Sequence, residues 1–318
     1  MVLAAGVGTR MRPLTLLRAK PALPVLNRPL LHWTLDCLAR NGITEAVVNL
    51  HHLPETVTEA IGDGSAFGVR VTYSRERSIL GTAGGPRKVR PLLGDDPILL
   101  VNGDVLFDFD LRKLIARHRA SGARATLALK PNPDVEAYPP VITAPDGSVR
   151  WLPGFGRRRR GVASLFTGVH VMDPQLLDRL SAGPADSVRD LYAPLLAEGG
   201  RILGVRVAGR WLDLGRPSLY LEAQLRQLSR GASRRADRCV VEASARLGRG
   251  ARLDRSVVGA GAIIGEGATV VRSVLWGGAR IGAGAAVRGS VVTDEGVVGE
   301  AERVTATVVT GAGRYPLA

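Results

Sequence analysis

The first 24 residues, MVLAAGVGTRMRPLTLLRAKPALP, decide how the rest of the chain is interpreted. They open on a short apolar run, residues 2–5, typical of the end of a buried parallel strand, and then continue into Gly6 and Gly8. Because glycine has no Cβ, its backbone N–H group can approach a phosphate closely. Arg10 and Lys20 follow with two positive charges. The stretch therefore predicts a loop that holds a ligand with several negative charges.

Two better-known phosphate-binding loops do not fit this stretch. A P-loop ends in Gly-Lys-Ser/Thr, which is absent here. The dinucleotide fingerprint requires a third glycine at the position of Met11. A bare Gly-x-Gly would favour an ordinary turn with solvated basic residues, so the interpretation depends on the longer pattern.

The longer pattern resembles the signature of the sugar-nucleotide pyrophosphorylases, a nucleotidyltransferase family: L-A-A-G-x-G-T-R-[LM]-x-P-L-T, followed by P-K-P. The matching residues are Gly6, Gly8, Thr9, Arg10, Pro13, Thr15, Lys20 and Pro21. Ala19 departs from the pattern, because the family usually has proline before the lysine. Family members also carry a few more residues of the first strand, so we expect the natural start to lie slightly upstream of Met1.

The resemblance implies roles for the residues of this stretch. It implies that nucleotide contacts come from Leu3, Ala4, Gly6, Gly8 and Thr9. It also implies that Arg10 and Lys20 are catalytic, with Arg10 neutralising the leaving pyrophosphate and Lys20 holding the phosphates near the α-phosphorus.

Composition bounds the class of protein. The 318 residues allow two domains, and 45% hydrophobic with 4% aromatic content predicts a core of Ala, Val and Leu. The net charge of +14 points to anionic partners, namely nucleic acid, a membrane surface or phosphorylated small molecules. Much of this charge is scattered arginine, and the few aromatic residues disfavour a base-stacking platform. We therefore expect phosphorylated small molecules rather than nucleic acid.

The cysteines and the apolar runs indicate a cytoplasmic protein. Cys37 and Cys239 are far apart, with no partner motif, and are interpreted as reduced packing residues. No apolar run approaches the length of a membrane span, and the N-terminus lacks a signal-peptide pattern. We expect no membrane partner.

Residues 29–74 predict the α/β class. Apolar residues recur at helical spacing over 29–41, and residues 46–50 form a buried-strand pattern. A helix over 55–61 and a strand over 69–74 follow. This alternation predicts a Rossmann-like domain with a mainly parallel sheet and crossover helices.

Residues 74–85, SRERSILGTAGG, are predicted to form a second glycine-rich loop. Such a loop can place backbone groups against a flat ring. It is similar to the L-G-T-A-G segment of the same family, which implies that Glu76, Gly81 and Thr82 contact the nucleotide.

Two aspartates are candidates for a magnesium site. The apolar run 98–101 ends in Asn-Gly-Asp, which places Asp104 at the carboxyl end of a central strand, where open α/β sheets bind ligands. Residues 210–217, RWLDLGRP, resemble the family's W-x-D-[VIL]-G-T-P. The resemblance implies that Asp104 and Asp213 together hold Mg²⁺, which suits carboxylate and phosphate oxygens.

The sugar side departs from the family pattern. We expect a helix over 108–121 with a solvated His118 and a strand over 125–130, and residues 138–149 resemble a hairpin of the same family. Pro139 replaces a glycine whose N–H contacts the sugar in the family, and the F-x-E-K-P segment is missing. Residues 157–160 are four arginines instead; they either bind the phosphate or form a basic loop. In the predicted strand 166–172, the resemblance places Thr167 and Gly168 near the sugar.

The C-terminal region repeats. After a Ser/Arg/Gly/Ala-rich linker, residues 229–237, aliphatic-Gly pairs begin at Leu247, Ile264, Ile281 and Val298, spaced by 17 residues (264 − 247, 281 − 264 and 298 − 281). This period predicts a parallel β-helix with three faces per coil over residues 238–318. The hexapeptide type and the left-handed winding come from the resemblance. The remaining residues, 1–228, are the predicted catalytic domain.

The five histidines, His32, His51, His52, His118 and His170, all precede the repeat, which disfavours a histidine-dependent acyltransferase there. We expect a scaffolding, oligomerising or regulatory role for the β-helix, and a homo-oligomer. The implied reaction is Mg²⁺-dependent transfer of a nucleotidyl group from a nucleoside triphosphate to a sugar 1-phosphate, with GDP-mannose as the first choice of product. UDP- or dTDP-hexose synthesis and a non-catalytic regulatory relative remain alternatives.

Overall fold

The computed structural model describes residues 1–132, 134–155, 160–228 and 238–318. The chain forms two compact units. The first unit contains Met1–Val7 and Leu31–Trp211, and the second contains Gly8–Leu30 and Leu212–Ala318. The N-terminal stretch is therefore divided, with its strand in the first unit and its Gly8, arginine and lysine positions in the second. The predicted linker, residues 229–237, lies outside the described residues.

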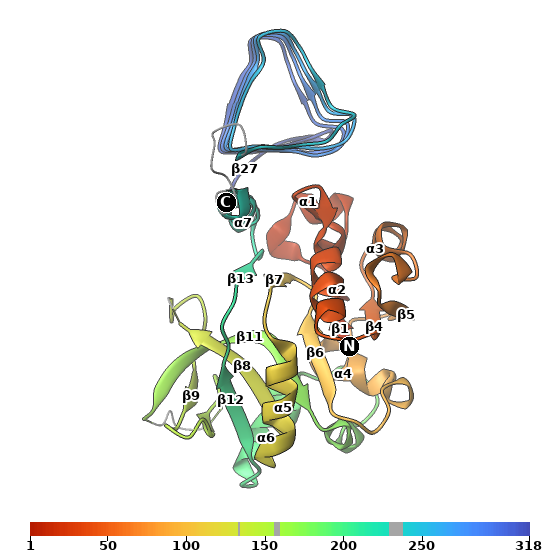
Figure 1. Ribbon diagram of the computed structural model, residues 1–318, viewed down its shortest axis with the longest axis vertical. Coiled ribbons are helices and arrows are strands. Elements are labelled where there is room, and N and C mark those ends of the chain that lie inside the picture. Colours follow the sequence, from red (N-terminus) through yellow and green to blue (C-terminus); the bar gives the residue numbers. More distant parts are fainter. Residues whose placement is uncertain (133, 156–159, 229–237) are drawn as a thin grey trace. The chain divides into compact units, whose positions relative to one another are not determined.

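In the described part of the first unit, nine strands form one sheet in the order β10-β9-β11-β6-β1-β4-β5, with β8 paired to β11 and β12 to β8 (Figure 1). The strands are β1 (Val2–Leu3), β4 (Glu45–Leu50), β5 (Arg70–Arg75), β6 (Ile98–Asn102), β8 (Ala125–Pro131), β9 (Val141–Thr143), β10 (Val149–Trp151), β11 (Val162–Met172) and β12 (Ile202–Arg206).

The centre of this sheet is parallel. Strand β1 pairs in parallel with β4 on one side and β6 on the other, with Val2 opposite both Val48 and Val101. Strand β5 extends the parallel set beyond β4. The prediction of an α/β fold is confirmed, and so is the hairpin, since β9 and β10 pair antiparallel. Because β4 and β6 flank β1 on opposite sides, the strand order reverses at β1, which is where open α/β sheets bind ligands.

The helices of the first unit are α2 (Leu30–Arg40), α3 (Pro54–Ile61), α4 (Gly81–Lys88), α5 (Leu111–Ser121) and α6 (Ala193–Ala197), and the short strand β7 (Val105–Phe107) follows β6. Helix α5 begins where the Asp110 carboxylate accepts a hydrogen bond from Lys113 N, and it is followed by Gly122 at φ 66°. This arrangement is a standard N-cap with a left-handed C-terminal glycine.

One prediction in this unit is wrong: residues 81–85 do not continue the glycine-rich loop but form the first turn and a half of α4. The glycines serve close packing here. A Cβ on Gly84 would lie 2.3 Å from Gly183 O, and one on Gly85 would lie 2.7 Å from Glu76 Oε1. Only glycine lets the helix approach both neighbours.

The prediction of a solvated His118 is also wrong. Its side chain is buried, with 3% exposed. Nδ1 lies 2.9 Å from Thr126 Oγ1, and Nε2 lies 3.2 Å from Asp173 Oδ1. Burial lowers the pKa of His118, and the neighbouring Asp173 carboxylate opposes that shift. The surrounding arginines on α5 misled the prediction, because His118 occupies the apolar face of the helix.

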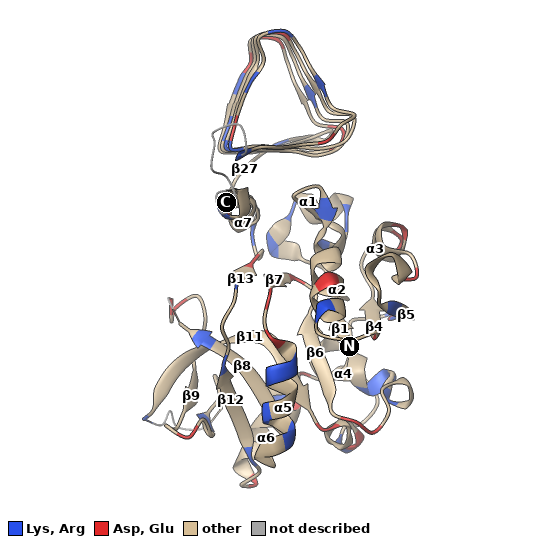
Figure 2. Ribbon diagram, viewed as in Figure 1, with Lys and Arg blue, Asp and Glu red and all other residues tan. Residues whose placement is uncertain are grey.

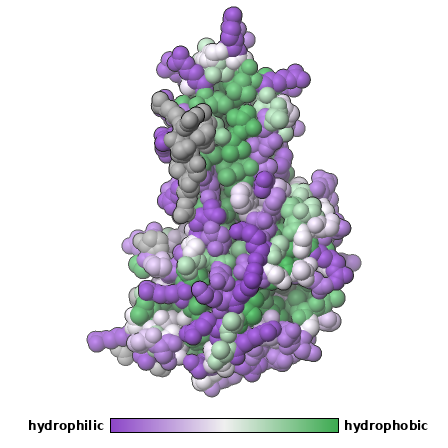
Figure 3. Space-filling model, viewed as in Figure 1, coloured by the Kyte–Doolittle hydropathy of each residue, from purple (hydrophilic) through white to green (hydrophobic). Residues whose placement is uncertain are grey.

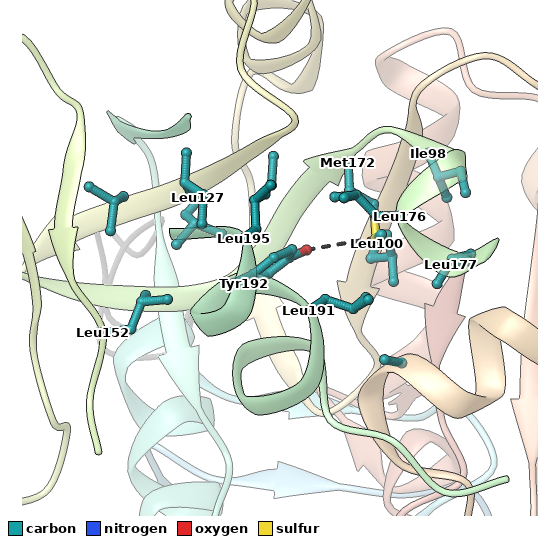
Figure 4. Packing of buried hydrophobic residues seen from close by; sticks show 14 of the residues in the cluster. Ile98, Leu100, Leu127, Leu152, Met172, Leu176, Leu177, Leu191, Tyr192 and Leu195 are labelled. Carbon is teal, nitrogen blue, oxygen red and sulfur yellow. Dashed lines mark hydrogen bonds between the residues drawn. The ribbon is translucent and has the colours of Figure 1, made fainter. Parts of the chain in front are cut away.

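A hydrophobic cluster on one side of the sheet supports strands β6, β8 and β11 (Figure 4). Tyr192 is fully buried within it, and its hydroxyl donates to Met172 Sδ at 3.7 Å. Beside Tyr192 lies His170 of β11, 2% exposed, with its ring stacked on Phe166. Neither ring nitrogen of His170 makes a hydrogen bond to any of the described residues.

We expect His170→Leu to reduce acid sensitivity. Burial lowers the pKa of His170 to about 3, so the native state stays neutral while the unfolded state binds a proton below its ordinary pKa of about 6.5. Stability is therefore lost as the pH falls from about 6.5 towards 3, by about 1.4 kcal/mol per pH unit. Urea titrations at pH 6.5 and 4.5 should show the variant gaining about 2 kcal/mol on the wild type. If the free energy of unfolding fell equally with pH in the variant and the wild type, the prediction would be wrong.

The second unit contains a β-helix whose coils superpose as a triangle (Figure 1). Its three sheets run in the orders β14-β17-β20-β23-β26-β27, β15-β18-β21-β24 and β16-β19-β22-β25. The first sheet has β14 (Val240–Val241), β17 (Val257–Val258), β20 (Val274–Leu275), β23 (Val291–Val292), β26 (Thr307–Thr310) and β27 (Gly313–Pro316). The second has β15 (Arg246–Leu247), β18 (Ile263–Ile264), β21 (Arg280–Ile281) and β24 (Val297–Val298), and the third β16 (Arg252–Asp254), β19 (Thr269–Val271), β22 (Ala286–Arg288) and β25 (Arg303–Thr305).

The 17-residue register is confirmed, because Leu253 lies opposite Val270, which lies opposite Val287. A second column is polar. Ser273 N donates to Ser256 Oγ at 3.2 Å, and Ser290 N donates to Ser273 Oγ at 3.1 Å. These buried serines therefore link successive coils at one corner.

The first coil of the β-helix leaves aliphatic side chains exposed. Val241 is 40% and Leu247 46% exposed, whereas Val258 and Ile264, one coil later, are almost fully buried. Among the described residues, nothing stacks on the outer side of that coil. Figure 3 shows hydrophobic residues at the surface of the β-helix.

The second unit also contains α1 (Leu14–Leu17), β2 (Pro24–Val25), β3 (Arg28–Pro29), the end of β13 (Trp211–Asp213) and α7 (Pro217–Leu228). Across the described ranges of both units, no helix is both long and apolar enough to pass through a bilayer.

Candidate active site

The candidate residues of the first unit gather where the central strands end. Gly103, just after β6, donates its N–H to Leu3 O of β1 at 2.8 Å. A Cβ on Gly103 would lie 2.9 Å from that oxygen, so the approach requires glycine. Asp104 follows directly and is half-buried. The sequence prediction that Asp104 follows a central parallel strand is therefore confirmed by the strand order.

A buried polar bridge holds the segment after β1. Ala4 N donates to Asn49 Oδ1 at 2.8 Å, and Asn49 Nδ2 donates to Glu76 Oε1 at 2.7 Å. The second oxygen of Glu76 accepts from Leu80 N at 3.0 Å. Both carboxylate oxygens of Glu76 are thus engaged by protein donors, and the side chain is buried. The bridge fixes the end of β1 relative to the turn that precedes α4.

The start of α4 is tied to a neighbouring segment. Gly81 has φ 76°, and a Cβ there would lie 2.5 Å from Ala185 O. Thr82 Oγ1 donates to Asp186 Oδ2 at 2.9 Å and accepts from Ser187 N at 2.8 Å. Both predicted nucleotide-binding residues therefore hold the first turn of α4 in place, with their backbone beside the Glu76 bridge.

Thr167 and Gly168 lie in β11 at a register shift against β8. The Thr167 hydroxyl is buried and donates to Ala128 O at 2.8 Å. Gly168 has φ 77°, and a Cβ there would lie 2.5 Å from Asn102 Nδ2 at the end of β6. The two residues therefore bring β11 against the strand that leads to Asp104.

In the second unit, the signature loop folds back on itself. Gly8 has φ 65°, and its carbonyl accepts from Thr15 Oγ1 at 2.8 Å. A Cβ on Gly8 would lie 2.9 Å from Thr15 Cγ2 and 3.7 Å from Lys20 Cβ. The loop thus places Gly8, Thr15 and Lys20 together. Lys20 is 6% exposed, whereas Thr9 and Arg10 are exposed.

Asp213 ends β13 in the second unit and is half-buried. A Cβ on Gly215 would lie 3.0 Å from Asp213 Oδ2, so this glycine leaves room for the carboxylate. In the first unit, the preceding segment is anchored by Asp108, whose carboxylate accepts hydrogen bonds from the backbone N–H and Nε of Arg210. The sequence prediction that Asp213 ends a strand is confirmed.

Carboxylates at two strand ends are the candidate metal ligands. Within the described ranges, no group of three or more His, Cys, Asp or Glu side chains could hold a metal ion. Mg²⁺ is commonly bound by one or two carboxylates together with substrate phosphates and water. Asp104 and Asp213, each half-buried at a strand end, are residues of that type.

Sequence reasoning missed three positions that organise the site: Asn49, Asp108 and Arg210. Asn49 had a signal, because it is the one polar residue within the apolar run 46–50. Asp108 and Arg210 had none, since their pairing joins residues 102 positions apart. Of the predicted arginine cluster, residues 157–159 lie outside the described part of the chain, and Arg160 is exposed.

Residues 1–230 match the family model described as "Nucleotidyl transferase", and residues 235–313 match "GMPPB C-terminal domain". The N-acetylmuramate alpha-1-phosphate uridylyltransferase of Neisseria meningitidis is 40% identical over 229 residues, covering 70% of this chain and 96% of that protein.

Two longer relatives are also similar. The UTP–glucose-1-phosphate uridylyltransferase of Synechocystis is 32% identical, covering 72% of this chain and 63% of that protein. The mannose-1-phosphate guanylyltransferase of Mycobacterium tuberculosis is 34% identical, covering 70% and 62% respectively. The aligned region thus spans less than two thirds of these two relatives.

Among solved structures, one described as a glucose-1-phosphate thymidylyltransferase of Bacillus anthracis aligns with a TM-score of 0.60 at 21% identity. It covers 73% of this chain and 95% of that one, and it supports the fold alone. The family model spans most of the chain and coincides with the strand-end site and the signature loop. The chain belongs to the nucleotidyl transferase family.

Proposed function

We propose that this protein transfers a nucleotidyl group from a nucleoside triphosphate to a sugar 1-phosphate, releasing pyrophosphate and an NDP-sugar. The observation that carries the proposal is the combination of the Gly8–Thr15–Lys20 loop with carboxylates at two strand ends. A glycine-containing loop with a lysine suits phosphate, and each carboxylate is of the type that binds a divalent cation.

GDP-mannose is the first choice of product. The match of residues 235–313 to the GMPPB C-terminal domain favours it, and several similar proteins are named mannose-1-phosphate guanylyltransferases. A UDP-sugar is the second candidate, because the Neisseria uridylyltransferase is 40% identical and is covered over 96% of its length. dTDP-hexose synthesis is the remaining alternative.

The chemistry needs no covalent enzyme intermediate. An oxygen of the sugar phosphate forms a bond to the α-phosphorus, and the bond from that phosphorus to the bridging oxygen of pyrophosphate breaks. Lys20 and Arg10 would neutralise the triphosphate, and the backbone of Leu3, Ala4, Gly6, Gly8 and Thr9 would contact it. Asp104 and Asp213 would hold Mg²⁺, which supplies charge neutralisation of the phosphates when bound.

Several side chains predicted to contact the base or the sugar already bond to other protein groups, which changes the role that we propose for them. Glu76 and Thr82 are engaged within the protein, so we assign them the task of holding the backbone of Gly81 against the base. Thr167 likewise holds Gly168, whose backbone would face the sugar. The net charge of +14 is distributed over both units, as Figure 2 shows, and does not form a separate argument for a nucleic-acid partner.

The Gly6→Ala substitution tests whether the loop binds the triphosphate at Gly6. Gly6 is exposed, and a Cβ there would meet no atom within 4 Å. We expect Gly6→Ala to leave the melting temperature unchanged but to raise KM for the triphosphate about tenfold or more, because the methyl occupies space that the phosphates approach. Unchanged KM in a folded Gly6→Ala protein would contradict the assignment of Gly6.

The assay that tests the function is pyrophosphate release from four ribonucleoside triphosphates and dTTP, each with mannose, glucose and N-acetylmuramate 1-phosphates. One pair should exceed the others by about tenfold or more in kcat/KM, and EDTA should abolish release. Binding of a nucleotide sugar with no release from any pair would favour the non-catalytic regulatory relative instead.

We also propose that the protein is a homo-oligomer associating through the β-helix. The exposed Val241 and Leu247 of the first coil support this, because aliphatic side chains at the end of a repeat array are usually covered. Sedimentation of the wild type measures the state directly. A monomer at micromolar concentration would contradict it.

A further inference from the structure

The segment that carries Lys20 is held against the β-helix within the second unit. Arg18 Nη2 donates to Asp294 Oδ2 at 2.6 Å. The guanidinium carbon of Arg18 also lies 5.2 Å from the ring centroid of Trp276, within the range of a cation–π contact. Asp294 and Trp276 belong to neighbouring coils, since Trp276 N donates to Val292 O. The β-helix corner formed by Trp276 and Asp294 therefore holds Arg18, two residues before Lys20.

The chain after Lys20 also makes contacts that lead to the β-helix. Trp276 Nε1 donates to the Tyr220 hydroxyl of α7 at 2.9 Å, and that hydroxyl donates to Pro24 O. Asn27 Nδ2 donates to Val258 O of the β-helix at 2.9 Å. Lys20 thus lies between two anchors, and both of them reach the β-helix.

The 17-residue repeat is irregular at this corner of the β-helix. Positions spaced by 17 residues carry Gly259, Trp276, Thr293 and Thr310, so a fully buried tryptophan replaces small residues in one coil. A regular coil has no need of a side chain this large. Its indole is covered instead by contacts with Arg18 and Tyr220.

The Arg18–Asp294 ion pair restrains the segment that carries Lys20. Asp294 Oδ1 is buried and makes no hydrogen bond within the described ranges of the chain, so Oδ2 carries the carboxylate's contact with Arg18. The side chains of Arg18 and Asp294 are 37% and 33% exposed, so removing Arg18 would leave a partly solvated carboxylate without its counter-charge, at a modest cost. The pair therefore favours one position of the Arg18–Lys20 segment over others.

We propose that Arg18, Asp294 and Trp276 are positioning residues for Lys20, so that the β-helix forms part of the apparatus that holds the triphosphate. This inference rests on the proposed function for its catalytic consequence, but not for its structural one. The three residues act through Lys20 and the turn that contains it, Lys20–Ala22. In that turn, Ala22 N donates to Ala19 O and Leu23 N donates to Lys20 O.

The test compares Asp294→Asn with a matched control, Glu302→Gln. Glu302 pairs with Arg314 at 2.6 Å in the same β-helix, and its side-chain exposure of 32% nearly equals the 33% of Asp294. The first readout is hydrogen exchange of the amides of Ala22 and Leu23, measured without substrate. We expect exchange about tenfold faster in Asp294→Asn and unchanged in Glu302→Gln.

The second readout is steady-state kinetics with the preferred substrate pair. Asp294→Asn should raise KM for the triphosphate and lower kcat/KM by about tenfold, with KM for the sugar phosphate little changed. Arg18→Lys, which keeps the charge, should retain more activity than Arg18→Gln. The double variant Arg18→Gln/Asp294→Asn should be no worse than Arg18→Gln alone, because both proteins lack the Arg18–Asp294 ion pair and the Arg18 contact with Trp276.

Three outcomes would overturn the inference. Exchange at Ala22 and Leu23 could match between Asp294→Asn and Glu302→Gln. Exchange could instead rise equally in β20 and β23, which would make the pair a general structural contact. Kinetics could also stay at wild-type values despite faster exchange at the turn. A wild-type protein that releases no pyrophosphate would contradict the proposed function, whereas the exchange measurement would still decide whether the β-helix positions Lys20.

Discussion

Replacing Asp104 by asparagine is expected to lower kcat for pyrophosphate release by about 10²–10³-fold. The reason is electrostatic. Asparagine keeps the size of the side chain but loses the negative charge that would attract a divalent cation. The loop itself should not move, because Gly103 N remains bonded to Leu3 O and the close approach at Gly103 is unaffected. The measurement is single-turnover and steady-state release at saturating substrates.

Asp36→Asn is the control for Asp104→Asn. Asp36 is also half-buried in the first unit, but it pairs with Arg40 on the surface of α2. The Asp36→Asn substitution removes one negative charge from the first unit, as Asp104→Asn does, but at a position away from the strand ends. Equal melting temperatures with unequal kcat would assign the loss to the site. An Asp104→Asn enzyme within about threefold of the wild-type kcat would refute a metal role for this carboxylate.

Local patterns in the sequence predicted the strand ends well. The apolar runs 2–5, 46–50 and 98–101 each became a parallel strand of the central sheet. A buried parallel strand must be apolar on both faces, so its pattern is visible without knowledge of its neighbours. The 17-residue period was equally local, because each coil packs on the next with the same register.

Long-range pairs account for what the sequence could not predict. His118 was placed in solvent from its arginine neighbours, yet Thr126 and Asp173 complete its surroundings from two other segments. Likewise, glycines 84 and 85 suggested a loop, whereas their function depends on contacts with Gly183 and Glu76. Such contacts leave no periodic trace along the chain. The Arg18–Asp294 pair, 276 residues apart, is the extreme case.

Lys20→Met should produce the second large loss, about 10²–10³-fold in kcat/KM. Methionine keeps most of the aliphatic stem that packs beside Gly8 but removes the ammonium group. We expect KM for the triphosphate to rise more than KM for the sugar phosphate. Lys113→Met, on the exposed face of α5, removes the same charge and should leave both constants unchanged.

Burial is the reason to expect more from Lys20 than from Arg10. Lys20 is 6% exposed, whereas Arg10 is exposed to solvent. A charge with little water around it interacts more strongly with a nearby phosphate than one in solvent does. Lys20→Met should therefore cost about tenfold more in kcat/KM than Arg10→Met under the same conditions, and raising the salt concentration should reduce the Arg10 effect more than the Lys20 effect. Equal losses with equal salt dependence would mean that the burial of Lys20 in the free protein has no bearing on how it binds the triphosphate.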